Sequence, residues 1–166
     1  MGDVDIRAVA PEEHDVAGEV VVAAYRAVPG SHMSGGYEDE LRAVGRRASE
    51  ADVLVAVEDG RILGCVTFVR DASSPWAEQL GAGESAIRMM AVVPAARGRG
   101  VGAALLSACV ERARAAGSAA LFLHSTPLMT VAHRLYERAG FVRAPERDWS
   151  PRPEVPLLAF RLDLSG

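Results

Sequence analysis

The sequence predicts an α/β domain of mixed α+β character, in which a mixed, mostly antiparallel sheet of six to seven strands carries helices on both faces. Three observations lead to this prediction. The chain has 166 residues, which fits a single domain over 1–166. An Asp-Gly turn at 59–60 joins two apolar stretches, which is typical of a β-hairpin. In the second half, apolar stretches alternate with helical patterns, which indicates a sheet covered by helices.

Each element follows from hydrophobic spacing and from the turn residues that bound it. The first half is expected to hold a strand at 3–9, helices at 11–28 and 37–50, hairpin strands at 52–57 and 61–69, and a long loop at 71–83. The second half is expected to hold strands at 86–93, 119–124, 141–143 and 157–164, helices at 100–116 and 130–140, and a proline-rich loop at 144–156. Thr130 is the expected N-cap of the last helix.

The composition excludes several classes of protein. A net charge of −4 disfavours non-specific binding to nucleic acid, which needs a basic face. The two cysteines, Cys65 and Cys109, form no paired motif, so neither a metal site nor a disulfide scaffold is expected. The N-terminus lacks the basic and apolar pattern of a signal peptide, and no apolar run reaches the ~18 residues of a membrane span. We therefore expect a cytoplasmic protein without a membrane partner.

The strongest chemical signal lies between Val92 and Ala103, where a predicted strand runs through a glycine-rich turn into a helix. The first turn of a helix has unpaired N–H groups and a partial positive charge. Glycines let the backbone approach a phosphate closely, and Arg97 and Arg99 add forked donors. The spacing fits neither a dinucleotide fingerprint nor a Walker A loop. The segment therefore predicts a different kind of pyrophosphate site.

The pattern Arg97-x-x-Gly100-x-Gly102 resembles the Arg/Gln-x-x-Gly-x-Gly/Ala signature of the GNAT superfamily of N-acetyltransferases. The flanking stretches 88–94 and 132–141 resemble that family too, and the order of elements matches from about 6 to 164. The resemblance implies a GNAT-like fold, with a V-shaped splay between the strands at 86–93 and 119–124. It also implies acetyl-coenzyme A as co-substrate, no metal, and an amine acceptor that is a small molecule or a peptide.

The resemblance also assigns residues. The backbone of Ala91, Val92 and Val93 would pair with the pantetheine arm, and the Val92 N–H would polarise the thioester carbonyl. The pyrophosphate would be held by Arg97, Gly98, Arg99, Gly100, Val101, Gly102 and Ala103. Tyr136 would donate a proton to the departing thiolate.

The general base stays open at this point. Glu84 shares a strand face with Ala86 and Arg88, and its carboxylate is one candidate. His124 and a water molecule are the others, whereas His133 is expected on the surface. Two positions depart from the family pattern: Met129 stands where many relatives have asparagine, and Ala86 stands where an acidic residue is common.

Cys65 and Cys109 are expected in the core, which favours direct attack of the amine in a ternary complex. Two alternatives to an enzyme remain. One is a non-catalytic acyl-coenzyme A sensor, and the other is an interaction module that forms a homodimer. The loops 29–36, 71–85 and 144–156 are expected to line the acceptor site. Asp71, Glu78 and Glu84 favour a cationic amine there, and Trp76 and Trp149 are candidate aromatic walls.

Overall fold

The computed structural model describes residues 4–28, 36–153 and 155–165. The expectations for 29–35 and for residue 3 lie outside the described residues. Among the described helices, none is both long enough and apolar enough to cross a membrane.

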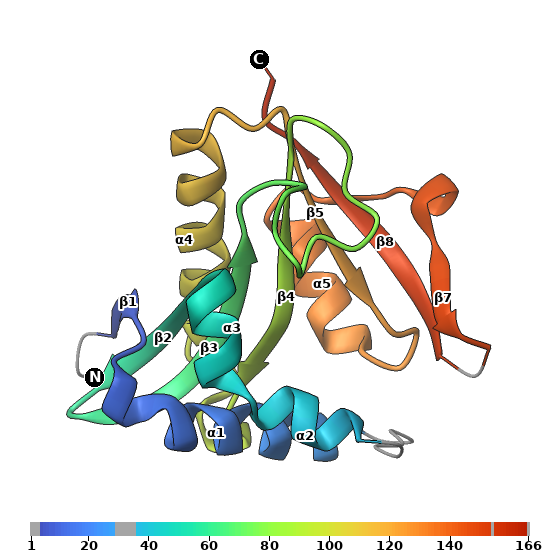
Figure 1. Cartoon of the computed structure of the whole chain (residues 1–166). Coiled ribbons are helices and arrows are strands. Elements are labelled where there is room, and N and C mark those ends of the chain that lie inside the picture. The colour runs from blue at the N-terminus through green and yellow to red at the C-terminus, as the bar shows by residue number, and fades with distance from the viewer. Residues whose placement is uncertain (1–3, 29–35, 154, 166) are drawn as a thin grey trace.

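An eight-stranded sheet forms the centre of the protein (Figure 1). The strands are β1 (Asp5–Ala8), β2 (Asp52–Glu58), β3 (Arg61–Val69), β4 (Glu84–Val92), β5 (Ala120–Ser125), β6 (Val142–Arg143), β7 (Trp149–Arg152) and β8 (Val155–Asp163). Their order is β1-β2-β3-β4-β5-β8-β6, and β7 pairs with β8. Only β4 and β5 run parallel among these pairs. The predicted mixed, mostly antiparallel sheet is confirmed, and β7 brings the strand number above the predicted six to seven.

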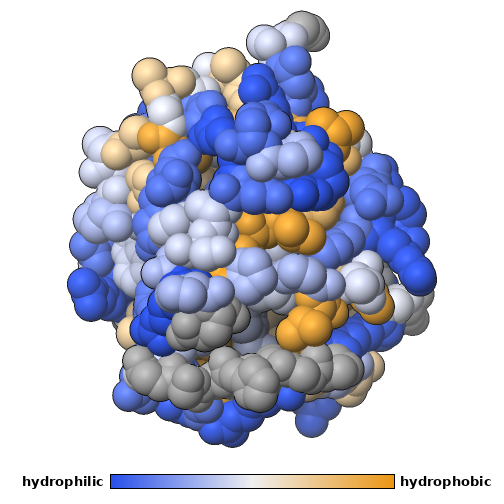
Figure 2. All heavy atoms as spheres, turned by 90° about the vertical axis from the view of Figure 1, so that its right-hand side faces the viewer, coloured by the Kyte–Doolittle hydropathy of each residue, from blue (hydrophilic) through white to orange (hydrophobic). Residues whose placement is uncertain are grey.

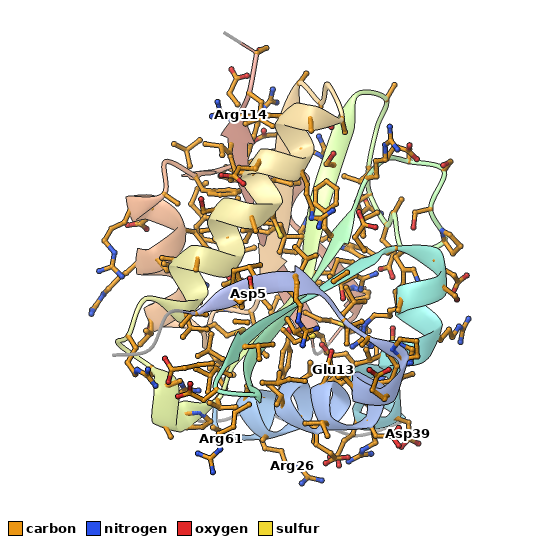
Figure 3. All side chains as sticks on the ribbon, turned by 90° about the vertical axis from the view of Figure 1, so that its left-hand side faces the viewer. Asp5, Glu13, Arg26, Asp39, Arg61 and Arg114 are labelled. Carbon is orange, nitrogen blue, oxygen red and sulfur yellow. The ribbon has the colours of Figure 1, made fainter. Side chains whose placement is uncertain are left out.

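Helices cover both faces of the sheet, as predicted (Figure 3). They are α1 (His14–Arg26), α2 (Tyr37–Arg42), α3 (Val44–Glu50), α4 (Val101–Ala115) and α5 (Thr130–Arg138), with short 3-10 turns at Pro11–Glu13, Pro94–Ala96 and Pro145–Arg147. One core cluster joins α1, α2 and α3 to the sheet, and a second joins α4 and α5 to the opposite face. Alternate residues of β2 pack into the two clusters: Val53 and Val55 face α1, whereas Leu54 faces α4.

The predicted helix at 37–50 is wrong as a single element, because the chain breaks at Ala43 (φ −79°, ψ 57°). The fully buried side chain of Arg47 explains the break. Its guanidinium donates hydrogen bonds to the Leu41 carbonyl (2.8 Å) and to the Glu40 carbonyl, and also contacts Thr67 Oγ1 (3.3 Å). The bonds to Glu40 and Leu41 satisfy carbonyls at the C-terminal end of α2. The contact with Thr67 links the break to strand β3.

The N-terminal entry into α1 is fixed by one carboxylate, that of Glu13, which is labelled in Figure 3. It accepts two hydrogen bonds from Arg7, both 2.8 Å, and one from the Ala10 N–H, also 2.8 Å. The Arg7 hydrogen bond is the largest cause that lowers the pKa of Glu13 from 4.5 to about 2. Glu13 therefore stabilises the folded chain only in its ionised form.

Candidate active site

The sheet forks between its two parallel strands. The pairing of β4 with β5 runs from Glu84 and Ala120 to Ile87 and Leu123 and goes no further. Figure 1 shows the two strands diverging toward the end where α5 lies. The predicted splay between the two strands is thus confirmed, and it begins after Ile87.

A β-bulge lies at the start of the fork. Two residues of β4, Met89 and Met90, stand opposite Val66 of β3, because Thr67 pairs with Arg88 and Cys65 with Ala91. Met89 has a φ of 53°, a value that non-glycine residues rarely adopt. A bulge bends the strand and increases its twist, so it turns the lower half of β4 away from β5.

The lower half of β4 presents backbone groups to the open fork. The Val93 N–H donates to the Leu63 carbonyl of β3 (2.9 Å). Because successive strand residues direct their N–H groups to opposite edges, the Val92 N–H points toward the fork. The Val93 carbonyl accepts from Ala96 (2.9 Å), so the backbone of Val93 already bonds within the protein. Of the segment predicted to pair with pantetheine, Val92 is thus the residue whose backbone best fits that role.

The glycine turn follows directly from β4 into α4. Gly98 (φ 81°) and Gly100 (φ 83°) both adopt the left-handed conformation that favours glycine. The first helical hydrogen bond runs from Ala104 to the Gly100 carbonyl (3.0 Å), and no side chain caps the helix. The N–H groups of Val101, Gly102 and Ala103 thus lie in the uncapped first turn. This geometry suits an anion.

Gly102 serves another purpose than the two glycines before it. A Cβ at this position would meet Leu135 Cδ2 at 3.0 Å, a contact tighter than most real ones. The absence of a side chain therefore lets α4 approach α5. The glycines of the turn were expected to let the backbone approach a phosphate. In the structure, Gly98 and Gly100 allow the left-handed turn, and Gly102 allows α4 and α5 to pack closely.

The two arginines of the turn also differ. Arg99 pairs with Glu58 at the end of β2 (2.6 Å), and this hydrogen bond lowers the pKa of Glu58. Arg97 is exposed, and no ion pair to it is recorded within the described ranges. Arg97 is thus the arginine whose guanidinium remains available to a ligand, whereas Arg99 links the turn to the β2–β3 hairpin.

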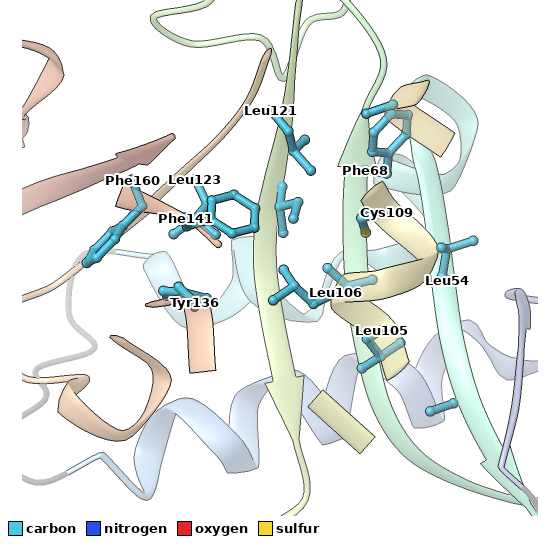
Figure 4. Close-up of a cluster of buried hydrophobic side chains, with 14 of the residues drawn as sticks. Leu54, Phe68, Leu105, Leu106, Cys109, Leu121, Leu123, Tyr136, Phe141 and Phe160 are labelled. Carbon is cyan, nitrogen blue, oxygen red and sulfur yellow. The ribbon is translucent and has the colours of Figure 1, made fainter. Parts of the chain in front are cut away.

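Tyr136 lies in α5 among aromatic side chains beside the fork (Figure 4). Its ring centroid lies 5.5 Å from that of Phe160 and 6.3 Å from that of Phe141. Burial raises the pKa of Tyr136 above its ordinary value, and a hydrogen bond with Ser125 partly offsets this rise. The hydroxyl is therefore protonated throughout the neutral range. The predicted N-cap of α5 is wrong: Met129 holds that position without a side-chain cap, and Thr130 is the first helical residue.

The expectation that His133 lies on the surface is wrong. This residue is half-buried, and its Nε2 lies 3.2 Å from Ser125 Oγ and 3.0 Å from the Thr126 carbonyl oxygen. Its ring centroid lies 6.4 Å from that of Tyr136. The i, i+3 spacing of His133 and Tyr136 places both on one side of α5, and this was the available signal. Ser125 thus connects His133 with the tyrosine.

Glu84 lies at the closed end of the β4–β5 pair, because its partner in the register is Ala120. From Ala120 to Ser125, β5 rises about 16 Å, so this end is distant from Tyr136. The Glu84 carboxylate binds Arg147 through two hydrogen bonds (2.7 and 3.1 Å) and accepts a third from the Gly81 N–H (2.8 Å). The Arg147 hydrogen bond is the largest cause that lowers the pKa of Glu84.

His124 lies at the fork. Ile87 and Leu123 both face α4, so the next residues, Arg88 and His124, both turn to the opposite face. The His124 Nε2 lies 3.1 Å from the Arg147 carbonyl oxygen, an acceptor, which favours a proton on Nε2 and a lone pair on Nδ1. Burial is the main cause that lowers the pKa of His124. The imidazole is thus neutral near pH 7.

The acidic side chains of the loop before β4 already have hydrogen-bonding partners. Glu78 forms an ion pair with Arg88 (2.9 Å). The carboxylate of Asp71 accepts hydrogen bonds from the backbone N–H and the hydroxyl of Ser73. Trp76 is 8% exposed and stacks under the Arg88 guanidinium, 5.6 Å from ring centroid to Cζ. Trp76 therefore anchors the loop. Trp149 begins β7 and pairs with Leu157 in β8.

The cysteines are unsuited to nucleophilic chemistry. Cys65 and Cys109 are both buried, and burial raises the pKa of each thiol to about 12. A thiol with such a pKa contains almost no thiolate at neutral pH. No group of three or more histidine, cysteine or acidic side chains is placed to hold a metal ion within the part of the chain that the structure describes.

A sheet that forks at a parallel strand pair, with a glycine turn where β4 enters α4, is the arrangement that the resemblance implied for an acyltransferase. Sequence comparison gives the family: the model of the acetyltransferase (GNAT) family matches residues 20–141, and the chain belongs to this family. A curated relative, an IAA acetyltransferase from Azospirillum brasilense, is 33% identical over 101 residues. The matched region covers 60% of this chain and 61% of that relative.

Solved structures show the same fold. A GNAT-family acetyltransferase from Staphylococcus aureus Mu50 superimposes with a TM-score of 0.78, at 14% identity, over 98% of this chain and 100% of that one. A GNAT-family acetyltransferase from Brucella melitensis, solved in complex with acetyl-CoA, has a TM-score of 0.67 at 24% identity, over 100% of this chain and 91% of that one.

Proposed function

We propose that this protein transfers the acetyl group of acetyl-coenzyme A to an amine by direct attack in a ternary complex. The observation that carries this proposal is the continuity of the fork with the glycine turn. The unpaired edge of β4 ends at Val92, and the uncapped N-terminus of α4 begins at Val101. An extended thioester and its pyrophosphate need these two features at opposite ends of one ligand.

The turn supplies the anion site of this proposal. The N–H groups of Val101, Gly102 and Ala103 would bind the pyrophosphate, and Arg97 would add charge. The Val92 N–H would stabilise the oxyanion that develops when the amine attacks the thioester carbon. The high pKa of both cysteines supports direct attack over an acyl-enzyme.

Tyr136 is the proposed proton donor. Its hydroxyl stays protonated because burial raises its pKa, and its ring is fixed by two phenylalanines. The departing thiolate would take the proton as the C–S bond breaks.

His124 is the proposed base that takes the proton of the amine, in preference to Glu84. The Glu84 carboxylate is occupied by Arg147 and lies at the closed end of the strand pair. The imidazole of His124 is neutral, lies at the fork, and offers Nδ1 when its Nε2 donates to the Arg147 carbonyl.

The test is a thiol-release assay with acetyl-coenzyme A and a panel of amines, applied to the wild type and to Tyr136→Phe. The phenylalanine keeps the packing and removes only the hydroxyl. We expect kcat to fall by about 10²- to 10⁴-fold, the range for one general acid, with little change in coenzyme A affinity. An unchanged kcat with a rate-limiting chemical step would remove Tyr136 from the mechanism. Coenzyme A binding without thiol release from any amine would favour the sensor alternative.

A further inference from the structure

We propose that the acceptor is an amine that carries a carboxylate, of the amino-acid class, and that Arg88 binds this carboxylate beside His124. This inference rests on the proposed acetyl transfer and names its substrate class.

The position of Arg88 is the first argument. Arg88 and His124 directly follow Ile87 and Leu123, the last paired residues of β4 and β5, and both turn to the face opposite α4. The last paired residues, just before them, lie about 4.8 Å apart, so the two side chains begin close together. The positive charge of Arg88 also contributes to lowering the pKa of His124. A ligand that carries both an amine and a carboxylate can contact both residues.

The donors of Arg88 are the second argument. The hydrogen bonds recorded for its guanidinium among the described residues all use Nη1, which donates to Glu78 (2.9 Å) and to the Trp76 carbonyl (3.4 Å). The Nη2 and Nε groups are thus open to a further acceptor within the described residues. A guanidinium presents its N–H groups as a fork that matches the two oxygens of a carboxylate. Trp76 supports the guanidinium from one side, which restricts its orientation.

The charge of the surroundings is the third argument. Two of the carboxylates behind the expectation of a cationic acceptor are paired with arginines: Glu84 with Arg147, and Glu78 with Arg88 itself. The fully buried Arg47 bonds Thr67, the residue that pairs with Arg88 in the sheet. Its other hydrogen bonds go to two carbonyls, and none goes to a carboxylate of the described residues. The charge of Arg47 is therefore not paired with a carboxylate of the described residues, and it favours an anionic group on the acceptor.

The inference can be tested with matched pairs of acceptors that differ only in the carboxylate. Free L-amino acids and their C-terminal amides have the same side chain and carry the primary amine on the same carbon. The amine of the amide is less basic, so a larger fraction of it is unprotonated, which works against the preference we expect. For the wild type, we expect kcat/KM for the best amino acid to exceed that for its amide. Arg88→Gln should lower kcat/KM for the amino acid by about 10- to 100-fold, the size of a lost charge-assisted pair, and change it little for the amide. The KM for acetyl-coenzyme A should stay the same.

Arg46→Gln is the control variant. Arg46 also lies over the ring of Trp76, at 5.9 Å, but it belongs to α3 and its side chain is 76% exposed. Its replacement removes the same charge and the same kind of ring contact, so it should leave the preference for the carboxylate unchanged. Equal effects of the two replacements would overturn the assignment of Arg88.

Binding measured without turnover separates the two proposals. Calorimetry with the coenzyme A complex should show that the amino acid binds more tightly than its amide, and that Arg88→Gln abolishes this difference. Such binding without any thiol release would overturn acetyl transfer and support the carboxylate site. Amides acetylated as well as amino acids, by the wild type and by Arg88→Gln alike, would overturn the carboxylate site and support acetyl transfer.

Discussion

Replacing Gly100 with alanine separates the stability of the glycine turn from its role in ligand binding. Gly100 has a φ of 83°, and a Cβ built there meets no atom within 4 Å. The cost of Gly100→Ala is therefore backbone strain alone, about 1–2 kcal/mol. For a chain of this length, such a loss lowers Tm by about 2–8 °C.

Gly117→Ala is the matched control at the other end of α4. Gly117 has a φ of 74° and the same open surroundings, so the strain is equivalent. We expect both variants to lose the same Tm without ligand. Differential scanning fluorimetry with and without coenzyme A then isolates the effect on binding.

The size of the ligand effect follows from mass action. At a coenzyme A concentration of 100 Kd, binding stabilises the folded chain by about 2.7 kcal/mol, which raises Tm by about 5–11 °C. A tenfold loss of affinity in Gly100→Ala would reduce this stabilisation to about 1.4 kcal/mol and roughly halve the shift. Gly117→Ala should keep the full shift. If the two variants respond to coenzyme A alike, the pyrophosphate lies elsewhere.

Three further predictions concern the proton and acyl transfers and the acid stability of the fold. Cys65→Ala and Cys109→Ala should keep the wild-type kcat, and an acetylated thiol found by intact-mass spectrometry would contradict direct attack. Expressed per unprotonated amine, kcat/KM should rise with pH only below about pH 6.5, since the pKa of His124 is lowered. This rise should disappear in His124→Gln and persist in Glu84→Gln, and the opposite result would make Glu84 the base. Because the pKa of Glu13 is lowered from 4.5 to about 2, its contribution is present above pH 4.5 and lost as the pH falls toward 2. Urea unfolding should show that Glu13→Gln removes this part of the pH dependence, about 1 kcal/mol after allowance for solvent screening, and an unchanged profile would contradict the assignment.

Most of the sheet could be predicted from the sequence, because each long strand has its own local signal. The Asp-Gly turn at 59–60 marked the hairpin of β2 and β3, and the glycine turn marked the junction of β4 with α4. The strand β7 was missed because Pro151 lies in its centre and indicated a loop. An edge strand tolerates proline, since one side of its backbone needs no ladder partner.

The parts that escaped prediction depend on contacts between distant residues. The break at Ala43 depends on Arg47 and Thr67, which meet only in the folded chain. The engagement of Glu84 depends on Arg147, 63 residues further along. Neither pairing leaves a periodic trace in the sequence, so the sequence predicts one helix at 37–50 and gives no sign that Arg147 binds Glu84.

The bulge at Met89 gives β4 two different faces along one strand. Before Met89 in the chain, even-numbered residues of β4 such as Ala86 face α1. After Met89, odd-numbered residues such as Ala91 face α1. One inserted residue thus lets the upper half close the sheet while the lower half offers its backbone to a ligand. The inward positions of β4 must therefore be counted separately on each side of Met89 when this strand is redesigned or aligned with relatives. Against a relative with the same bulge, an alignment that places a gap at Met89 exchanges the positions that face α1 with those that face α4 in the segment that follows.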